Sequence, residues 1–123
     1  MKPYGKELII DIHGCGPGEF SREEIKQYFD DLCFRIDMKQ CDLHFWDDLE
    51  TPEDKKQTSP HTVGVSAIQF ILTSNITIHT LPLLGKVFVN IFSCKDFNSR
   101  DAANFSVDFF GGRIAKETEV IRL

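Results

Sequence analysis

The chain has 123 residues and a mass of 14.1 kDa, a length typical of one domain spanning residues 1–123. Hydrophobic residues make up 41% and charged residues 27%, which is the balance of a globular protein with its own core. The formal net charge of −5 disfavours nucleic-acid and anionic-membrane binding, because both need clustered Lys and Arg.

Targeting signals and disulfides are not indicated. No segment approaches the roughly 18 uninterrupted apolar residues of a membrane span. The start, MKPYGKELII, lacks the apolar core and cleavage site of an export signal, so we expect a cytoplasmic protein. The four cysteines (Cys15, Cys33, Cys41 and Cys94) contain no CxxC pair. A zinc or redox motif is therefore not indicated, and free thiols are expected.

The first predicted elements are a strand and a helix. Glu7–His13 has the apolar run of a strand, and the glycine-rich segment Gly14–Gly18 ends it. That segment lacks the GxGxxG pattern, so we interpret it as a connection and not as a phosphate loop. Ser21-Arg22-Glu23-Glu24 is a capping box. It precedes apolar residues at helical spacing: Ile25, Phe29, Leu32, Cys33 and Ile36.

The middle of the chain is rich in strand patterns. A polar loop, Leu49–Pro60, separates the first of these strands from the rest. The polar step Thr73-Ser74-Asn75 interrupts the apolar runs, and its simplest interpretation is a turn. The predicted strands are Asp42–Asp48, Thr62–Leu72, Ile76–Leu81 and Lys86–Ser93.

The last elements complete an α+β pattern. Ser99 is the expected cap of a second helix, Gly111-Gly112 ends it, and Arg113–Arg122 reads as a strand. We predict a two-layer sandwich, in which two helices cover one face of an antiparallel sheet. Many apolar residues lie on both sides of the strand over Phe88–Phe92, which indicates that a second subunit covers the other face of the sheet. The expected assembly is a sheet-to-sheet homodimer.

One segment carries chemically capable side chains at specific spacing. The stretch Thr73–Leu83 (TSNITIHTLPL) resembles the central motif of bacterial and archaeal S-adenosylmethionine decarboxylases, Glu-Ser-His-x-Ser-Ile-His-Thr-Trp-Pro-Glu. The family's catalytic cysteine, in a Phe-x-Cys context, falls on Cys94. A serine eight residues before the cleaved one falls on Ser66, and an early Gly-Cys falls on Gly14-Cys15.

The resemblance implies a proenzyme that cuts itself between Thr73 and Ser74. In that family the serine hydroxyl attacks the preceding carbonyl, and a base removes the serine α-proton. The chain then breaks and leaves a pyruvoyl group. The resemblance gives Ser74 as the pyruvoyl precursor, His79 as the processing base and Ser66 as its assistant; a histidine can transfer protons near neutral pH. The pyruvoyl cofactor serves as the electron sink for decarboxylation.

The resemblance also implies that Cys94 is the proton donor of the decarboxylation step. The whole assignment requires the Cys94 thiol and the His79 imidazole to lie near the Ser74 hydroxyl. The family's Glu and His that flank the cleaved serine are Thr73 and Asn75 here. Thr73 does not forbid the cleavage, because the chemistry uses the carbonyl of the preceding residue and not its side chain.

The substrate contacts differ more. Pro60, Leu81 and Leu83 stand where the family has residues that contact the adenosyl group. Losing a stacking ring or a ribose acceptor costs on the order of 1–3 kcal/mol each. The first hypothesis is a pyruvoyl decarboxylase of spermidine (polyamine) biosynthesis that acts on S-adenosylmethionine, or on another amino acid such as arginine or ornithine. The other hypothesis is an uncleaved homologue with a binding or regulatory role.

Overall fold

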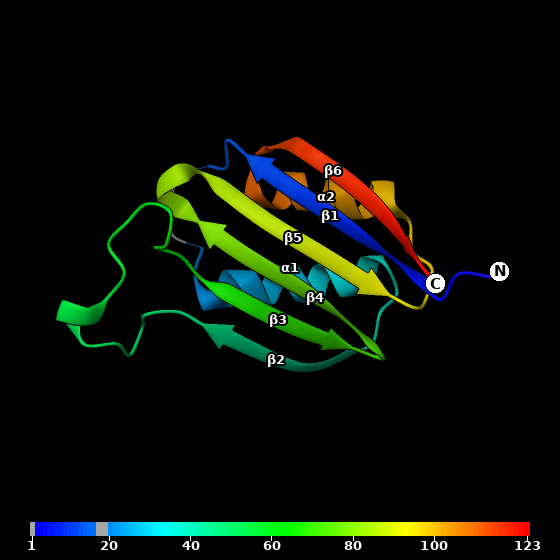
Figure 1. The fold of residues 1–123 in the computed structure, drawn as a ribbon, viewed down its shortest axis with the longest axis horizontal. Coiled ribbons are helices and arrows are strands. Elements are labelled where there is room, and N and C mark those ends of the chain that lie inside the picture. Colours follow the sequence, from blue (N-terminus) through cyan, green and yellow to red (C-terminus); the bar gives the residue numbers. More distant parts are fainter. Residues whose placement is uncertain (1, 17–19) are drawn as a thin grey trace.

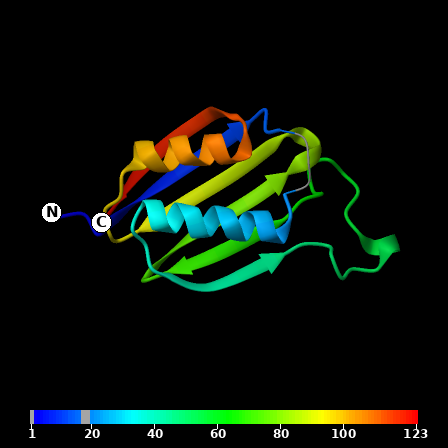
Figure 2. The ribbon, with the colours of Figure 1, turned by 180° about the vertical axis from the view of Figure 1, so that it is seen from behind.

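The computed structural model describes residues 2–16 and 20–123, and over these residues it contains one six-stranded antiparallel sheet with two α-helices (Figure 1). The strand order is β2-β3-β4-β5-β1-β6. Seen from behind, both helices lie on the same face of the sheet (Figure 2). The α+β sandwich that the sequence predicts is confirmed. Its elements in chain order are β1 (Gly5–His13), α1 (Arg22–Arg35), β2 (Gln40–Trp46), β3 (Ser66–Ile71), β4 (Ser74–Leu81), β5 (Lys86–Ser93), α2 (Ser99–Phe110) and β6 (Arg113–Arg122).

The core lies between the sheet and the two helices. Along β5 the side chains of Val87, Val89 and Ile91 are buried, while their neighbours point to the other face. This alternation is what a strand with one covered face requires. From the helical layer α1 buries Tyr28 and Phe29 in the same core. Each such large side chain contributes about 1.5–3 kcal/mol when it leaves water.

The helix ends follow capping chemistry, with one correction. Ser21 caps α1, because its Oγ accepts the backbone N–H of Glu24 at 3.2 Å. The expected cap of α2, Ser99, is wrong: Asn98 is the cap and accepts the N–H of Asp101 at 2.9 Å. Ser99 instead donates to a carboxylate on β6. Both residues are good caps by type, so tertiary contacts decide between them.

Helix α2 ends where the glycine pair predicted. Gly111 is its C-cap in the left-handed conformation, with φ of 68°, which glycine adopts without a steric penalty.

Two strand boundaries near the polar step differ from the predictions. The strand expected from Thr62 begins only at Ser66, because Thr62 and its neighbour turn back onto the Ser59 carbonyl. The strand expected from Ile76 begins at Ser74, which pairs with Ile71. The turn is therefore Leu72-Thr73, so the first residue of the polar step lies in the turn and the other two begin β4. A two-residue hairpin loop fixes this register.

The remaining differences are small. Strand β2 covers Gln40–Trp46 in place of the expected Asp42–Asp48. The polar loop Leu49–Pro60 contains a short 3-10 turn, Glu53–Lys55. Part of the glycine-rich connection, residues 17 and 18, lies outside the described residues. Within the described parts of the chain, no helix is both long and apolar enough to span a bilayer.

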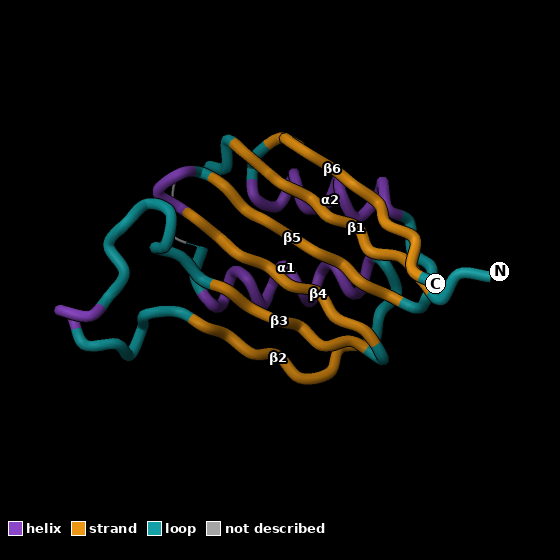
Figure 3. Tube along the Cα trace, viewed as in Figure 1, coloured by secondary structure: helices purple, strands orange, loops and turns teal. Residues whose placement is uncertain are grey.

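Over residues 2–16 and 20–123, no helix covers the second face of the sheet (Figures 1 and 3). Large apolar side chains are exposed there on β2 and β3: Trp46 is 61% exposed, Phe70 41% and Ile68 39%. Clustered apolar side chains on an open sheet face are typical of a contact surface.

A buried hydrogen bond joins the two helices and gives a stability prediction. The hydroxyls of Tyr28 and Ser106 lie 2.7 Å apart, and both residues are fully buried. Ser106→Ala leaves the tyrosine hydroxyl without this partner, so we expect a loss of about 1–3 kcal/mol in the free energy of unfolding. Tyr28→Phe should cost less, because Ser106 also donates to the Ala102 carbonyl at 2.8 Å. Urea unfolding of both variants checks this order, and equal stability of Ser106→Ala and the parent would contradict it.

Candidate active site

A serine and a cysteine meet where β4 begins and β5 ends. The Ser74 hydroxyl lies 3.7 Å from the Cys94 sulfur, and it accepts the Cys94 backbone N–H at 3.1 Å. The Thr73 hydroxyl lies 3.6 Å from the same sulfur. Cross-strand pairing produces this contact. Asn75 pairs with Phe92 in an antiparallel register, so the residues just before Asn75 lie beside those just after Phe92. The thiol is thus close to the hydroxyl that the resemblance marks for cleavage.

The hydroxyls around Cys94 change its acidity. Hydrogen bonding from the Thr73 side chain, and then from Ser74, lowers the pKa of the Cys94 thiol to about 7. Hydrogen bonds to the thiolate stabilise the charged form, which is why the pKa falls. In contrast, burial raises the pKa of the Cys33 thiol to about 12. A group with a pKa near 7 transfers protons efficiently at neutral pH.

Tyr4 is a member of this site that the sequence analysis missed. It lines the same hollow as Cys94 and contributes, after Thr73 and Ser74, to the lowered pKa of the thiol, and its ring stacks on Phe92 with the centroids 6.3 Å apart. A hollow of about 270 Å³ adjoins the thiol, and the chain start, the end of β5 and the following turn line it. Residues 4 and 94 are far apart in the sequence, so only the β1–β5 register reveals this contact.

The second predicted pair, Ser66 and His79, lies elsewhere. The two residues are directly opposite each other on β3 and β4. The Ser66 hydroxyl lies 2.6 Å from Nδ1 of His79, and the imidazole stacks on Phe88 with the centroids 6.4 Å apart. Both side chains are half-buried on the face of the sheet that no helix covers. The pair is therefore a formed hydrogen-bonded unit that faces outward.

The structure does not bring the four side chains together in one chain. His79 follows Ser74 by five residues along the same strand, which separates their backbones by about 16 Å. Five is an odd number, so the two side chains alternate to opposite sides of β4. The requirement that the thiol lies near the hydroxyl is met, and the requirement that the imidazole lies near it is not met within one chain.

The positions matched to adenosyl contacts lie toward the histidine end. Leu81 ends β4 and is buried, whereas Leu83 is exposed in the short turn after it. Pro60 is exposed in the loop between β2 and β3. A larger hollow, of about 500 Å³, lies between this loop, the start of α1 and Leu83. It contains none of Ser66, Ser74, His79 and Cys94.

The acidity of Cys94 can be measured on uncleaved protein, such as the His79→Ala variant if His79 is required for cleavage. Only the thiolate reacts with iodoacetamide, so the rate should rise with pH through a midpoint near 7. Thr73→Val removes the hydroxyl with the largest effect, and the midpoint should move upward. Peptide mass mapping separates Cys94 from the exposed Cys41, which serves as the internal comparison. A midpoint near the ordinary value of 9 in the parent would contradict the contact.

Comparison with known proteins identifies the family. By its fold and its serine–cysteine contact, the chain is an α+β sandwich protein in which a serine at the start of a strand lies beside a thiol. The family model described as S-adenosylmethionine decarboxylase matches residues 6–123. The chain belongs to the S-adenosylmethionine decarboxylase family.

Individual relatives show the same match over the whole chain. The S-adenosylmethionine decarboxylase proenzyme of Syntrophomonas wolfei is 38% identical over 127 residues, which cover 99% of this chain and 89% of the relative. The proenzyme of Clostridium kluyveri is 28% identical over 125 residues, with the same coverage. The crystal structure of the adenosylmethionine decarboxylase from Aquifex aeolicus superposes with a TM-score of 0.75 and 16% identity, covering 99% of this chain and 92% of that one. This last likeness supports the fold.

Proposed function

We propose that the chain is a self-cleaving proenzyme whose product decarboxylates S-adenosylmethionine. The observation that carries the proposal is the contact of the Ser74 hydroxyl with the Cys94 sulfur and amide. In the cleavage step, Ser74 Oγ attacks the Thr73 carbonyl carbon, and the amide becomes an ester. Removal of the Ser74 α-proton then breaks the ester. Residue 73 is left with a carboxylate, and hydrolysis at residue 74 releases ammonia and leaves a pyruvoyl group.

The chain's own residues supply the proton handling. The Cys94 N–H donates to Ser74 Oγ and orients this hydroxyl before cleavage. After cleavage, the pyruvoyl group at residue 74 supplies an electron sink for loss of carbon dioxide. Cys94 Sγ then holds the proton that the substrate α-carbon takes up. The pKa near 7 suits this role, because the thiol can give up the proton and regain it at neutral pH.

The processing base comes from a second copy of the chain in this proposal. The exposed apolar face of the sheet supports a sheet-to-sheet homodimer, and His79 with Ser66 lies on that face. An isologous interface whose two-fold axis runs across β4 exchanges the two ends of that strand, since residue i of one copy meets residue j of the other. Such packing carries the Ser66–His79 end of one β4 toward the Ser74 end of its partner's β4. The imidazole of one chain then approaches residue 74 of its partner from the open face of the sheet, whereas the Ser74 hydroxyl points to the helix-covered face.

The substrate and the compartment complete the proposal. The positions matched to the family's adenosyl contacts, Leu81 and Leu83, lie near His79 and so approach the partner's Ser74 in the same dimer. The free thiols are compatible with a reducing cytoplasm. The test is release of labelled carbon dioxide from S-adenosylmethionine, with arginine and ornithine as comparison substrates. Release from none of the three by cleaved protein would refute the activity.

A further inference from the structure

The hydroxyl of Ser93 closes a tight turn around Cys94. Ser93 is 1% exposed, and its Oγ accepts the Lys95 N–H at 3.0 Å and donates to the Lys95 carbonyl at 2.7 Å. Both main-chain groups of the residue after Cys94 are thus tied to the side chain of the residue before it. Cys94 lies at the apex of this turn, so the direction of its amide and thiol depends on the Ser93 hydroxyl.

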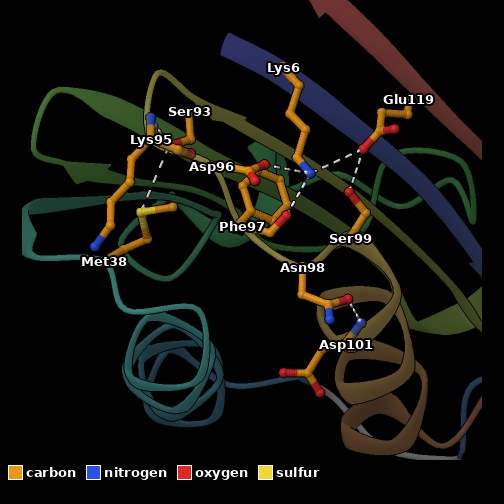
Figure 4. A network of polar contacts seen from close by, with 10 residues as sticks. All are labelled: Lys6, Met38, Ser93, Lys95, Asp96, Phe97, Asn98, Ser99, Asp101 and Glu119. Carbon is orange, nitrogen blue, oxygen red and sulfur yellow. Dashed lines mark hydrogen bonds and ion pairs between the residues drawn. The ribbon is translucent and has the colours of Figure 1, made fainter.

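Lys6 holds the next two residues of the same connection (Figure 4). Its side chain is only 15% exposed, and its ammonium donates to the Phe97 carbonyl. The ammonium also pairs with Asp96 at 3.2 Å and lies 4.4 Å from the centre of the Phe97 ring. Glu119 on β6 is its third charged contact, at 3.3 Å. A nearly buried ammonium is stable only when it is paired, and here its partners include the turn that follows Cys94.

The backbone is equally restricted on the other side of the thiol. Lys6 pairs with Ser93 across β1 and β5. A Cβ at the neighbouring Gly5 would collide with the Ser93 carbonyl oxygen and would lie 2.8 Å from the Cys94 Cα. Such close approach leaves little room for the turn to move toward β1. Among the remaining restraints on the turn, the Ser93 hydroxyl and the Lys6 ammonium are buried or nearly buried, whereas the Lys95 ammonium pairs with Asp37 at the surface.

We infer that Ser93 and Lys6 are positioning residues that hold the Cys94 amide and thiol against the Ser74 hydroxyl. Neither side chain touches the reacting atoms; each acts through the turn. The consequence for catalysis rests on the proposed function, but the placement of the thiol does not.

The first test follows Cys94 on uncleaved protein, in a His79→Ala background if the parent cleaves. Ser93→Ala and Lys6→Met should each raise the pH midpoint of Cys94 alkylation by at least about one unit, because the thiol leaves its hydroxyl partners. Ser99→Ala is the matched control: it removes a hydroxyl from the same polar network but not from the turn, and the midpoint should not change. Ser93→Thr and Lys6→Arg keep the donors and should restore the parent midpoint.

Folding is checked by circular dichroism and thermal unfolding of every variant. If Ser93→Ala does not fold, Lys6→Met with its Lys6→Arg rescue decides the outcome. An unchanged alkylation midpoint in the folded variants would overturn the inference, even if decarboxylation is confirmed. In cleaved protein, the same variants should lower kcat about tenfold with KM unchanged. A parent that never cleaves would refute the proposed function, while the alkylation result would still decide this inference.

Discussion

Replacing Ser74 by alanine is expected to leave a single species of the full 14.1 kDa after long incubation. The parent should separate into fragments 1–73 and 74–123, because only a hydroxyl at residue 74 can attack the preceding carbonyl. The C-terminal fragment should be blocked to amino-terminal sequencing, since a pyruvoyl group replaces its α-amine. Intact mass under denaturing conditions measures both results.

The matched control for this cleavage is Ser99→Ala, a serine at the start of α2 away from the β4 hairpin, which should cleave like the parent. Cys94→Ala should still cleave in part, but its decarboxylation should fall by on the order of 100-fold or more, as expected for loss of a general acid. Full decarboxylation by this variant would remove the role given to Cys94. A parent that remains one 14.1 kDa species would favour an uncleaved homologue.

Mixing two inactive variants is expected to restore cleavage. A Ser74→Ala chain keeps His79, and a His79→Ala chain keeps Ser74, so neither should cleave as a homodimer. In a mixed dimer, the intact imidazole of the first chain approaches the intact residue 74 of the second. Half of the sites in such dimers are complete, and the His79→Ala chain alone should be cut. The physical reason is the separation of about 16 Å between residues 74 and 79 on one strand.

The mixing experiment needs two chains that are distinguishable by mass. A tag on the Ser74→Ala chain identifies which polypeptide breaks, and denaturation with joint refolding forms the mixed dimer. As a control, Trp46→Asp on both chains adds a charge to the exposed apolar face and should reduce dimerisation and restoration together. Cleavage of an isolated monomer at the parent rate would contradict the two-chain site.

Much of the fold could be predicted from local patterns. The capping box at Ser21 and the glycine at residue 111 give the helix ends because they act through contacts a few residues away. Strand positions such as Val87 and Val89 follow from alternation. The errors at Ser99 and Thr62 occur where a residue suited to one local role is used by a distant partner or an adjoining turn.

The sequence by itself determined the family, the order of the elements and the candidate residues Ser66, Ser74, His79 and Cys94, because motif spacing and periodicity are written along the chain. Only the tertiary structure decided how these residues are grouped. Strand pairing puts Cys94 beside Ser74, and it places His79 with Ser66 at the other end of β4 and on the opposite face. Register and the direction of each side chain depend on cross-strand hydrogen bonds between distant segments, which no local pattern specifies.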